Sequence, residues 1–326
     1  MNIRRLFSMF LLFAACSLQA ANIDLTRTTA EMRSGLVVTT RTPRLGWQMI
    51  SSDNTEVQTS YELEVTNRIS GRSGFPHWKG TERTEQLVKS NTAVGDYNWR
   101  VRVWNKSDEP SSWSDKGRFI ITNVKASFGE SRWIGAITKA DAHTPEGRIF
   151  HGSEMKKETV KAAWAAADSL SRKSIYVRTT FTSQQKKVKQ AVVNICGLGL
   201  YELSINGKKV GNSEFTPLIS DYDKSVWYNT YDVTTLLQKG NNAIGVLLGN
   251  GFYNVQGGRY RKLLISFGPP TVRLQLTIHY EDGTSQTVAS DKTWKYDFSP
   301  VTFNCIYGGE DYDARQEQKG WNMAKF

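Results

Sequence analysis

One tyrosine and three acidic residues near the C-terminus form the densest group that could carry out acid–base chemistry. Glu310, Asp311 and Asp313 flank Tyr312 within four consecutive positions. A pair of carboxylates can supply a general acid and a general base. Arg315 lies two residues after Asp313, and a local Asp–Arg ion pair is favoured over catalysis. We therefore expect no catalytic residue here.

Other polar groups offer metal or phosphate binding, and each has a simpler explanation. Asp221 and Asp223 lie in a loop, where they suit a cation held by hard oxygens or, more simply, a solvated turn. The glycines around Asn250 lack a Walker-type lysine and a following helix, which argues against a phosphate site. The four histidines (His77, His143, His151 and His279) show no paired spacing for a metal.

Cys196 and Cys305 are too few to form a disulfide framework in an exported chain of this length. Cys196 ends the apolar run 191–196 and is interpreted as a buried thiol. A Cys196–Cys305 bridge is the alternative.

The composition is that of a globular protein, with 39% hydrophobic and 22% charged residues among 326. Forty-two Lys and Arg against 31 Asp and Glu give a formal net charge of +11. The basic runs at 186–189 and 259–262 are short, so a solvated basic surface is favoured and no nucleic-acid partner is expected.

The N-terminus indicates export. Arg4 and Arg5 precede an apolar stretch, residues 6–15, that is too short to span a bilayer, and Ala20 ends a signal peptide of residues 1–20. The expected location is the periplasm or the extracellular space, with no transmembrane helix in the mature chain. In an alternative interpretation, Cys16 follows Ala14-Ala15 in a lipoprotein cleavage site and anchors the protein to the outer membrane.

Alternating apolar and polar residues predict an all-β fold with two domains. Residues 22–123 contain short strands, and Trp99, Val101 and Val103 share one strand face. The pattern at 97–119 resembles the last strands of a fibronectin type III-like sandwich. After a linker at 123–135, residues 131–326 predict a larger, jelly-roll-like β-sandwich with a short helical insertion near 154–170. Asn206-Gly207 predicts a two-residue hairpin turn.

Several motifs then follow in one order: YELSINGKKV at 201–210, TP at 216–217, DYDK at 221–224, YDVT at 231–234 and NAIGVLLGNGFY at 242–253. In that order they resemble the N-terminal β-sandwich of bacterial α-L-rhamnosidases, glycoside hydrolase family 78. RTPRLGWQ at 41–48 resembles the start of that family's leading fibronectin-like domain. YGGEDYDAR at 307–315 and GW at 320–321 resemble the end of its second sandwich, and this resemblance implies that an Asp313–Arg315 pair holds the exit strand.

This resemblance implies a parent enzyme that hydrolyses terminal α-L-rhamnosides with inversion in an (α/α)₆ barrel further along the chain. The only extended helical pattern here is 154–170, which cannot form that barrel. We therefore expect an N-terminal, non-catalytic portion that is inactive alone and whose partners are the missing C-terminal catalytic domains. A stand-alone carbohydrate-binding or adhesion module and a structural spacer are the alternatives.

The resemblance also implies a sugar site in the second sandwich, in which a calcium ion bridges protein oxygens to sugar hydroxyls. The carbohydrate-binding candidates are Asn206, Asn250, Phe252 and Tyr253, with rhamnose-containing glycans or glycosides as ligands. Asn206 and Asn250 are weak candidates for holding Ca²⁺, because no acidic residue stands beside Asn206. The aromatic pair would stack on the sugar face. Without a ligand, Asn206 is simply a turn residue.

Overall fold

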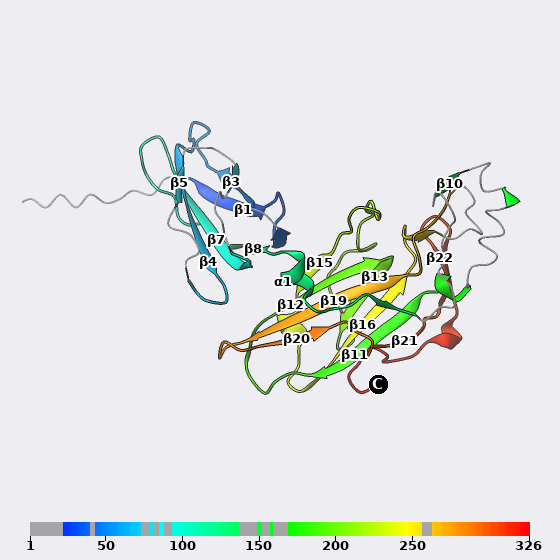
Figure 1. Cartoon of the computed structure of the whole chain (residues 1–326). Helices are drawn as coiled ribbons and strands as arrows, with labels where there is room; N and C mark the ends of the chain where they lie inside the picture. Colours follow the sequence, from blue (N-terminus) through cyan, green and yellow to red (C-terminus); the bar gives the residue numbers. More distant parts are fainter. Residues whose placement is uncertain are drawn as a thin grey trace, which may run out of the picture. The chain divides into compact units, whose positions relative to one another are not determined.

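The computed structural model describes residues 22–39, 43–72, 78–80, 85–87, 93–136, 149–151, 157–158, 169–255 and 263–326. The chain divides between Ile121 and Thr122 into two compact units, which we call unit 1 and unit 2 (Figure 1). No helix of the described part of the chain is long and apolar enough to cross a membrane. The predicted signal peptide lies outside the described residues.

Unit 1 contains two β-sheets, with strand orders β1-β3-β6 and β2-β8-β7-β4-β5. All its strand pairs are antiparallel except β2 and β8, which are parallel. The strands are β1 (Asp24–Ala30), β2 (Leu36–Thr39), β3 (Arg44–Ile50), β4 (Ser60–Asn67), β5 (Trp78–Gly80), β6 (Glu85–Leu87), β7 (Gly95–Trp104) and β8 (Gly117–Ile121).

Strand β7 shows why unit 1 forms a sandwich. Trp99, Val101 and Val103 are all buried in the core, as their shared face predicts. On the opposite face, Arg100 and Arg102 pair with glutamates of β4 and lie 4.6 and 4.9 Å from the Trp113 ring centroid. One face of the strand thus forms the core and the other a ladder of stacked cations.

Unit 2 is a larger β-sandwich with two main sheets, ordered β14-β13-β16-β11-β21 and β15-β12-β19-β20, the second extended by β9 on β19. The main-sheet strands are β9 (Ile134–Gly135), β11 (Ile175–Thr182), β12 (Val188–Leu198), β13 (Leu200–Ile205), β14 (Lys208–Lys209), β15 (Asn229–Asp232), β16 (Asn241–Gly249), β19 (Thr271–Tyr280), β20 (Ser285–Ala289) and β21 (Lys295–Phe298). A small sheet contains β10 (Ile149–His151), β17 (Asn254–Val255) and β18 (Leu263–Ser266), and β22 (Val301–Cys305) pairs with β23 (Gly309–Tyr312).

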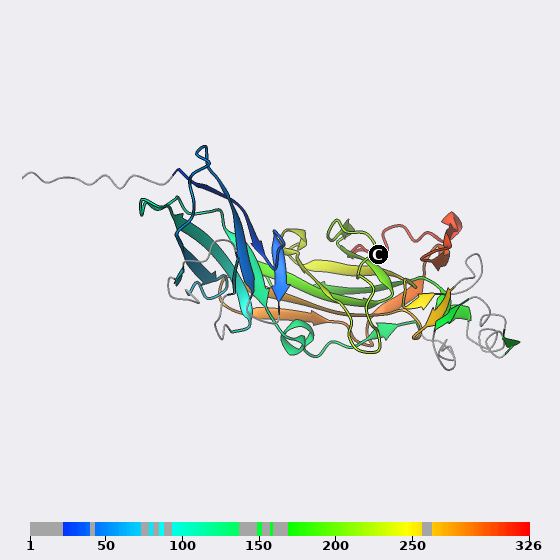
Figure 2. The ribbon, with the colours of Figure 1, turned by 90° about the horizontal axis from the view of Figure 1, so that it is seen from above.

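The core of unit 2 lies between these two main sheets, whose strands form stacked layers in Figure 2. Alternate residues of β12, among them Val193 and Ile195, face inward and are fully buried. Val246 and Leu248 of β16 face them from the other sheet. The all-β, two-sandwich fold expected from the alternation is confirmed.

The segment predicted as a linker is in part an ordered element of unit 2. Helix α1 (Val124–Phe128) begins at Asn123, whose side chain accepts the Ala126 N–H at 2.9 Å. Phe128 is buried, and Asn194 of β12 donates to the Ser127 carbonyl at 2.9 Å. The linker prediction was therefore wrong at this point, because a capped single turn finds its apolar contacts only in the folded sheet.

The predicted helix near 154–170 falls mostly outside the described residues. At its C-terminal end the structure has a short 3₁₀ helix, Ser169–Arg172, which leads into β11. The predicted domain bounds 22–123 and 131–326 stay predictions.

The C-terminal segment folds back over the outer face of the β13–β16–β11 sheet, as the red trace in Figure 2 shows. The Trp321 ring stacks on Tyr176 with centroids 4.0 Å apart, and Asn322 donates to the Ser204 hydroxyl at 3.0 Å. A Cβ at Gly245 would lie 2.7 Å from Trp321, so glycine there makes room for the segment.

Candidate functional site

Asn206 occupies the tight turn that the sequence predicts. Asn206 and Gly207 have φ of 51° and 78°, and Ser204 and Ile205 pair with Lys209 and Lys208. These values are those of a type I′ hairpin, so the turn prediction is confirmed.

The Asn206 side chain is buried and bonded to its own sandwich. Its amide nitrogen donates to the Leu236 carbonyl at 3.0 Å and to Asn242 Oδ1 at 2.8 Å, and its oxygen accepts the Ala243 N–H at 2.8 Å. This arrangement ties the hairpin to β16. A sugar or calcium contact at Asn206 stays a prediction, and these bonds would have to be given up for it.

Asn250 is fully buried at the end of β16. Its side-chain nitrogen donates to the Arg172 carbonyl at 2.7 Å, and its oxygen accepts from Asn254 at 2.9 Å. Its backbone N–H donates to Asn304 Oδ1 at 2.8 Å. Asn250 therefore positions Asn304, and its direct contact with a ligand stays a prediction.

The two asparagines lie at opposite ends of one strand pair. In the β13–β16 register, Leu200 faces Gly249, next to Asn250, and Ile205, next to Asn206, faces Ile244. Five strand steps of about 3.4 Å separate the ends by about 17 Å. A single monosaccharide or calcium ion cannot contact both residues.

The aromatic candidates beside Asn250 are half-buried and point into two different clusters. Phe252 makes an edge contact with Tyr307, at 5.7 Å between centroids. Tyr253 contacts Tyr222 and Phe267, and its hydroxyl donates to the Phe267 carbonyl at 3.0 Å. Tyr253 thus anchors the 221–224 loop, and its role as a sugar platform stays a prediction.

A pocket of about 280 Å³ opens next to Asn250, at the Gly249 end of the strand pair. We call it the Glu310 pocket. Its lining comes from five separate segments: Ser174; Leu200, Tyr201 and Glu202; Ser213, Glu214 and Phe215; Leu247 and Gly249; and Val301, Asn304 and Glu310. The volume lies at the small end of ligand sites, which suits one sugar ring.

The polar groups of the Glu310 pocket are held in place from behind. Asn304 donates to the Ser174 hydroxyl at 2.6 Å while accepting from Asn250. Lys209 donates to Glu202 at 3.3 Å and to Glu214 at 2.9 Å, and these hydrogen bonds, that of Glu214 above all, raise the pKa of Lys209. The pocket therefore presents fixed amide and carboxylate acceptors to a ligand.

An apolar rim borders the Glu310 pocket. Phe215 lines it and is 70% exposed, and Leu218 and Ile219 nearby in sequence are also exposed. Apolar side chains stack on the C–H face of sugars while amides and carboxylates bind their hydroxyls. Sequence reasoning missed Phe215, Glu202 and Asn304; the apolar run beside Thr216-Pro217 in a polar loop was the available signal.

The acidic clusters singled out in the sequence form local ion pairs. Arg315 binds Asp313 through two hydrogen bonds of 2.8 Å, which lower the pKa of Asp313, and Lys224 binds Asp221 at 2.9 Å. Within the described ranges, no group of three or more His, Cys, Asp or Glu residues is placed to hold a metal ion. The expected Asp313–Arg315 pair is confirmed.

Cys196 and Cys305 are both buried and free, so the alternative of a disulfide bridge between them was wrong. The Cys196 thiol donates to the Trp227 carbonyl at 3.0 Å, and burial raises its pKa to about 12.

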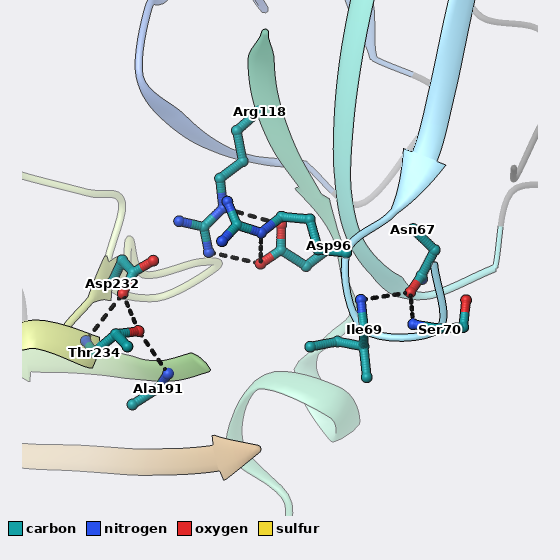
Figure 3. A network of polar contacts seen from close by, with 9 residues as sticks. Asn67, Ile69, Ser70, Asp96, Arg118, Ala191, Asp232 and Thr234 are labelled. Carbon is teal, nitrogen blue, oxygen red and sulfur yellow. Dashed lines mark hydrogen bonds and ion pairs between the residues drawn. The ribbon is translucent and has the colours of Figure 1, made fainter. Parts of the chain in front are cut away.

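The YDVT motif at 231–234 has a structural role. The Asp232 carboxylate accepts the Thr234 N–H at 3.0 Å and the Thr234 hydroxyl at 2.6 Å. The same hydroxyl accepts the Ala191 N–H at 2.8 Å, as Figure 3 shows. These bonds fix the end of β15 against β12.

Comparisons with known proteins agree with this architecture. The model of the α-L-rhamnosidase N-terminal domain matches residues 186–326, and that of the Rha78A-like N-terminal immunoglobulin domain matches residues 26–123. An α-L-rhamnosidase of Formosa agariphila is 36% identical over 275 residues, which is 82% of this chain and 27% of the relative. One from an Alteromonas species is 28% identical, covering 87% of this chain and 30% of that protein.

A solved α-L-rhamnosidase from Dictyoglumus thermophilum superposes with a TM-score of 0.70 at 28% identity, over 93% of this chain and 32% of that one. The two sandwiches are thus the N-terminal domains of a class of glycoside hydrolases. The chain belongs to the α-L-rhamnosidase family and matches an N-terminal portion of it. It spans less than a third of the length of these three relatives.

Proposed function

We propose that this chain is the accessory portion of an exported α-L-rhamnosidase and that unit 2 binds a rhamnose residue in the Glu310 pocket. The observation that carries the first part is the match of both units to α-L-rhamnosidases over 82–87% of the chain. The parent enzyme would release terminal α-L-rhamnose from glycans or glycosides, with its catalytic domain elsewhere. The helices whose bounds the structure gives, at 124–128, 169–172, 234–236 and 314–316, are each of five residues or fewer.

The accessory role is tested by an assay with an aryl α-L-rhamnoside. The purified chain should release no more phenol than the buffer blank. Inverting hydrolysis needs an acid and a base that flank one bond, and in this proposal both belong to the catalytic domain elsewhere in the parent enzyme. Clear turnover that is lost in Glu310→Gln would contradict the accessory role and make the pocket catalytic.

Sugar binding in the Glu310 pocket rests on its size, its fixed acceptors and its apolar rim. A molecule as small and polar as L-rhamnose is expected to bind with Kd on the order of 0.1–1 mM. No calcium is required in this proposal, because carboxylate and amide acceptors can bind the sugar hydroxyls directly. A chelator should leave the affinity unchanged.

Calorimetric titration with L-rhamnose measures this binding. Glu310→Gln and Phe215→Ala should each weaken binding about fivefold or more. Asn250→Ala should weaken it too, because it removes the side-chain hydrogen bond of 3.2 Å from Asn250 to the Asn304 carbonyl. Glu281→Gln removes an exposed carboxylate that pairs with Lys187 away from the pocket, and it should bind as the parent does. Equal affinity in all four variants, or no heat at millimolar sugar, would refute the pocket.

Export is the remaining part of the proposal. The short apolar stretch after Arg4 and Arg5 supports it, with cleavage after Ala20 and release into the periplasm or the medium. N-terminal mass spectrometry of protein made in its own cells tests this. A mature chain beginning at Ala21 supports release, an acylated Cys16 supports a membrane-anchored lipoprotein, and an intact Met1 would contradict export.

A further inference from the structure

Unit 1 contains a larger cavity of about 590 Å³ that no part of the proposed function uses. It lies along β1 and the start of β8, and we call it the Arg118 cleft. Its lining is Leu25, Thr26, Arg27 and Thr28 of β1; Ser34, Gly35 and Leu36; and Arg68, Asn98, Asp115, Lys116, Gly117 and Arg118.

Cations dominate this lining. Arg27, Arg68, Lys116 and Arg118 contribute four positive charges, whereas Asp115 is the single acidic residue of the lining. When Asp96, which contacts two of these arginines, is added, four positive and two negative charges leave +2. Charges of one sign gathered on a concave surface raise the local concentration of oppositely charged ligands.

One cation of the cleft is fixed and two are exposed. Arg118 donates to both carboxylate oxygens of Asp96, at 3.0 and 2.6 Å, in the pair drawn in Figure 3. Arg27 and Lys116 are exposed and form no ion pair with another described residue. A rigid wall with two exposed cations at its edge is a suitable arrangement for recognising an anion.

The cleft also offers neutral hydrogen-bonding groups. Thr26, Thr28, Ser34 and Asn98 supply hydroxyls and an amide. Behind the wall, Trp99 is 1% exposed, and its indole N–H has no hydrogen-bond partner. A Cβ at Gly117 would collide with this Nε1 and lie 3.2 Å from Thr28 Oγ1, so the unpaired N–H dipole lies directly behind the Gly117 wall of the cleft.

The backbone is distorted where Arg27 enters the cleft. Arg27 has φ of 45°, a conformation that L-residues rarely adopt, and the β1–β3 register shifts between Thr26 and Thr29. Bulges of this kind redirect a side chain away from the regular alternation of a strand. Strained backbone of this kind is concentrated at functional sites.

We propose that the Arg118 cleft binds an anionic saccharide, one that carries a carboxylate or a sulfate ester. The exposed cations Arg27 and Lys116 bind the oxyanion, and Arg68 and Arg118, which pair with Asp96, add to the positive potential of the wall. The hydroxyls and Asn98 bind the sugar's own hydroxyls. The saccharide part of this class rests on the glycan-degrading role proposed above; the oxyanion part rests on the cleft alone. The site lies in unit 1 and shares no residue with the Glu310 pocket.

Calorimetric titration of the full chain with D-glucuronate tests the proposal, with D-glucose and inorganic sulfate as separate arms. Glucuronate should bind at least tenfold more tightly than glucose, and raising the salt from about 20 to 200 mM should weaken it. Arg27→Gln and Lys116→Gln should each weaken glucuronate about fivefold. Lys106→Gln, an exposed lysine of unit 1 outside the lining, should bind as the parent does.

Three results would overturn the inference. If glucuronate binds no more tightly than glucose, the cleft does not recognise the oxyanion. If inorganic sulfate binds as tightly as glucuronate, the cleft does not recognise the saccharide. An equal loss in Lys106→Gln places the effect in the overall charge and not in the cleft. L-rhamnose binding to the Glu310 pocket is measured in a separate titration. If that pocket binds no L-rhamnose, the glucuronate titration still tests the Arg118 cleft.

Discussion

At the scale of single residues, Gly245 shows how a missing side chain positions a whole segment. A Cβ there would lie 2.7 Å from both Trp321 and the Cβ of Asn322. We predict that Gly245→Ala lowers the free energy of unfolding by about 1–3 kcal/mol, because overpacking forces neighbours apart. Chemical denaturation measures this. In a chain that ends at Lys319 the same change should cost far less, and an equal cost there would contradict the explanation.

Cys196 gives a second prediction at this scale. Burial raises the pKa of its thiol to about 12, so at pH 8 almost none of the thiol is in the reactive thiolate form. We predict that iodoacetamide labels Cys196 far more slowly in the native protein than in denaturant, as peptide mass spectrometry would show. Equal labelling in both states would mean that Cys196 is accessible.

Asn206 marks how far residue-level prediction reaches. Its place in the turn follows from the neighbouring glycine and the flanking alternation, and the structure confirms it. Its hydrogen bonds to Leu236, Asn242 and Ala243 connect positions 30 to 37 residues apart. No local sequence pattern encodes such distant partners. For this reason the sequence suggested the Asn206 side chain as a sugar ligand, whereas the structure shows it hydrogen-bonded within its own sandwich.

At the scale of elements, the β13–β14 hairpin depends on that same side chain. Asn206→Ala would leave the Ala243 N–H without its acceptor. It would also place alanine, which disfavours positive φ more than asparagine does, at a φ of 51°. We predict a loss of about 2–4 kcal/mol in the free energy of unfolding. Asn212→Ala, an exposed position just past the hairpin, is the control and should stay within about 0.5 kcal/mol. Similar losses in both would contradict the role of the network.

The strands were predictable because alternation reports directly which side chains face a core. The strands at 175–182, 188–198 and 271–280 all match such runs. Helix α1 was missed because five residues carry no helical period. Its stability comes from the Asn123 cap and from Phe128 packing on the sheet, both of which need the folded unit.

At the scale of the whole molecule, the two units have separate hydrophobic cores. We predict that residues 122–326 made alone fold cooperatively and that the parent chain unfolds in two transitions, one matching that fragment. Near-ultraviolet circular dichroism during thermal unfolding would show both. A fragment without fixed tertiary signal would contradict the independence of unit 2.

The Glu310 pocket could not be found from the sequence because its lining comes from segments up to 136 residues apart, from Ser174 to Glu310. The sequence motifs mark the strands and turns that bring these segments together, and Asn250 acts one step behind the lining through Asn304. The family resemblance indicated the correct sandwich, and the location of the pocket within it required the tertiary structure.

A crystal structure of the chain grown with L-rhamnose tests the central claim most directly. The claim predicts one sugar ring between Phe215 and Glu310, with a hydroxyl bonded to Asn304. In Glu310→Gln crystals soaked at a sugar concentration near the parent Kd, the occupancy of the same site should be lower. A sugar bound at the Asn206 hairpin instead, or no ordered sugar in unit 2, would contradict it.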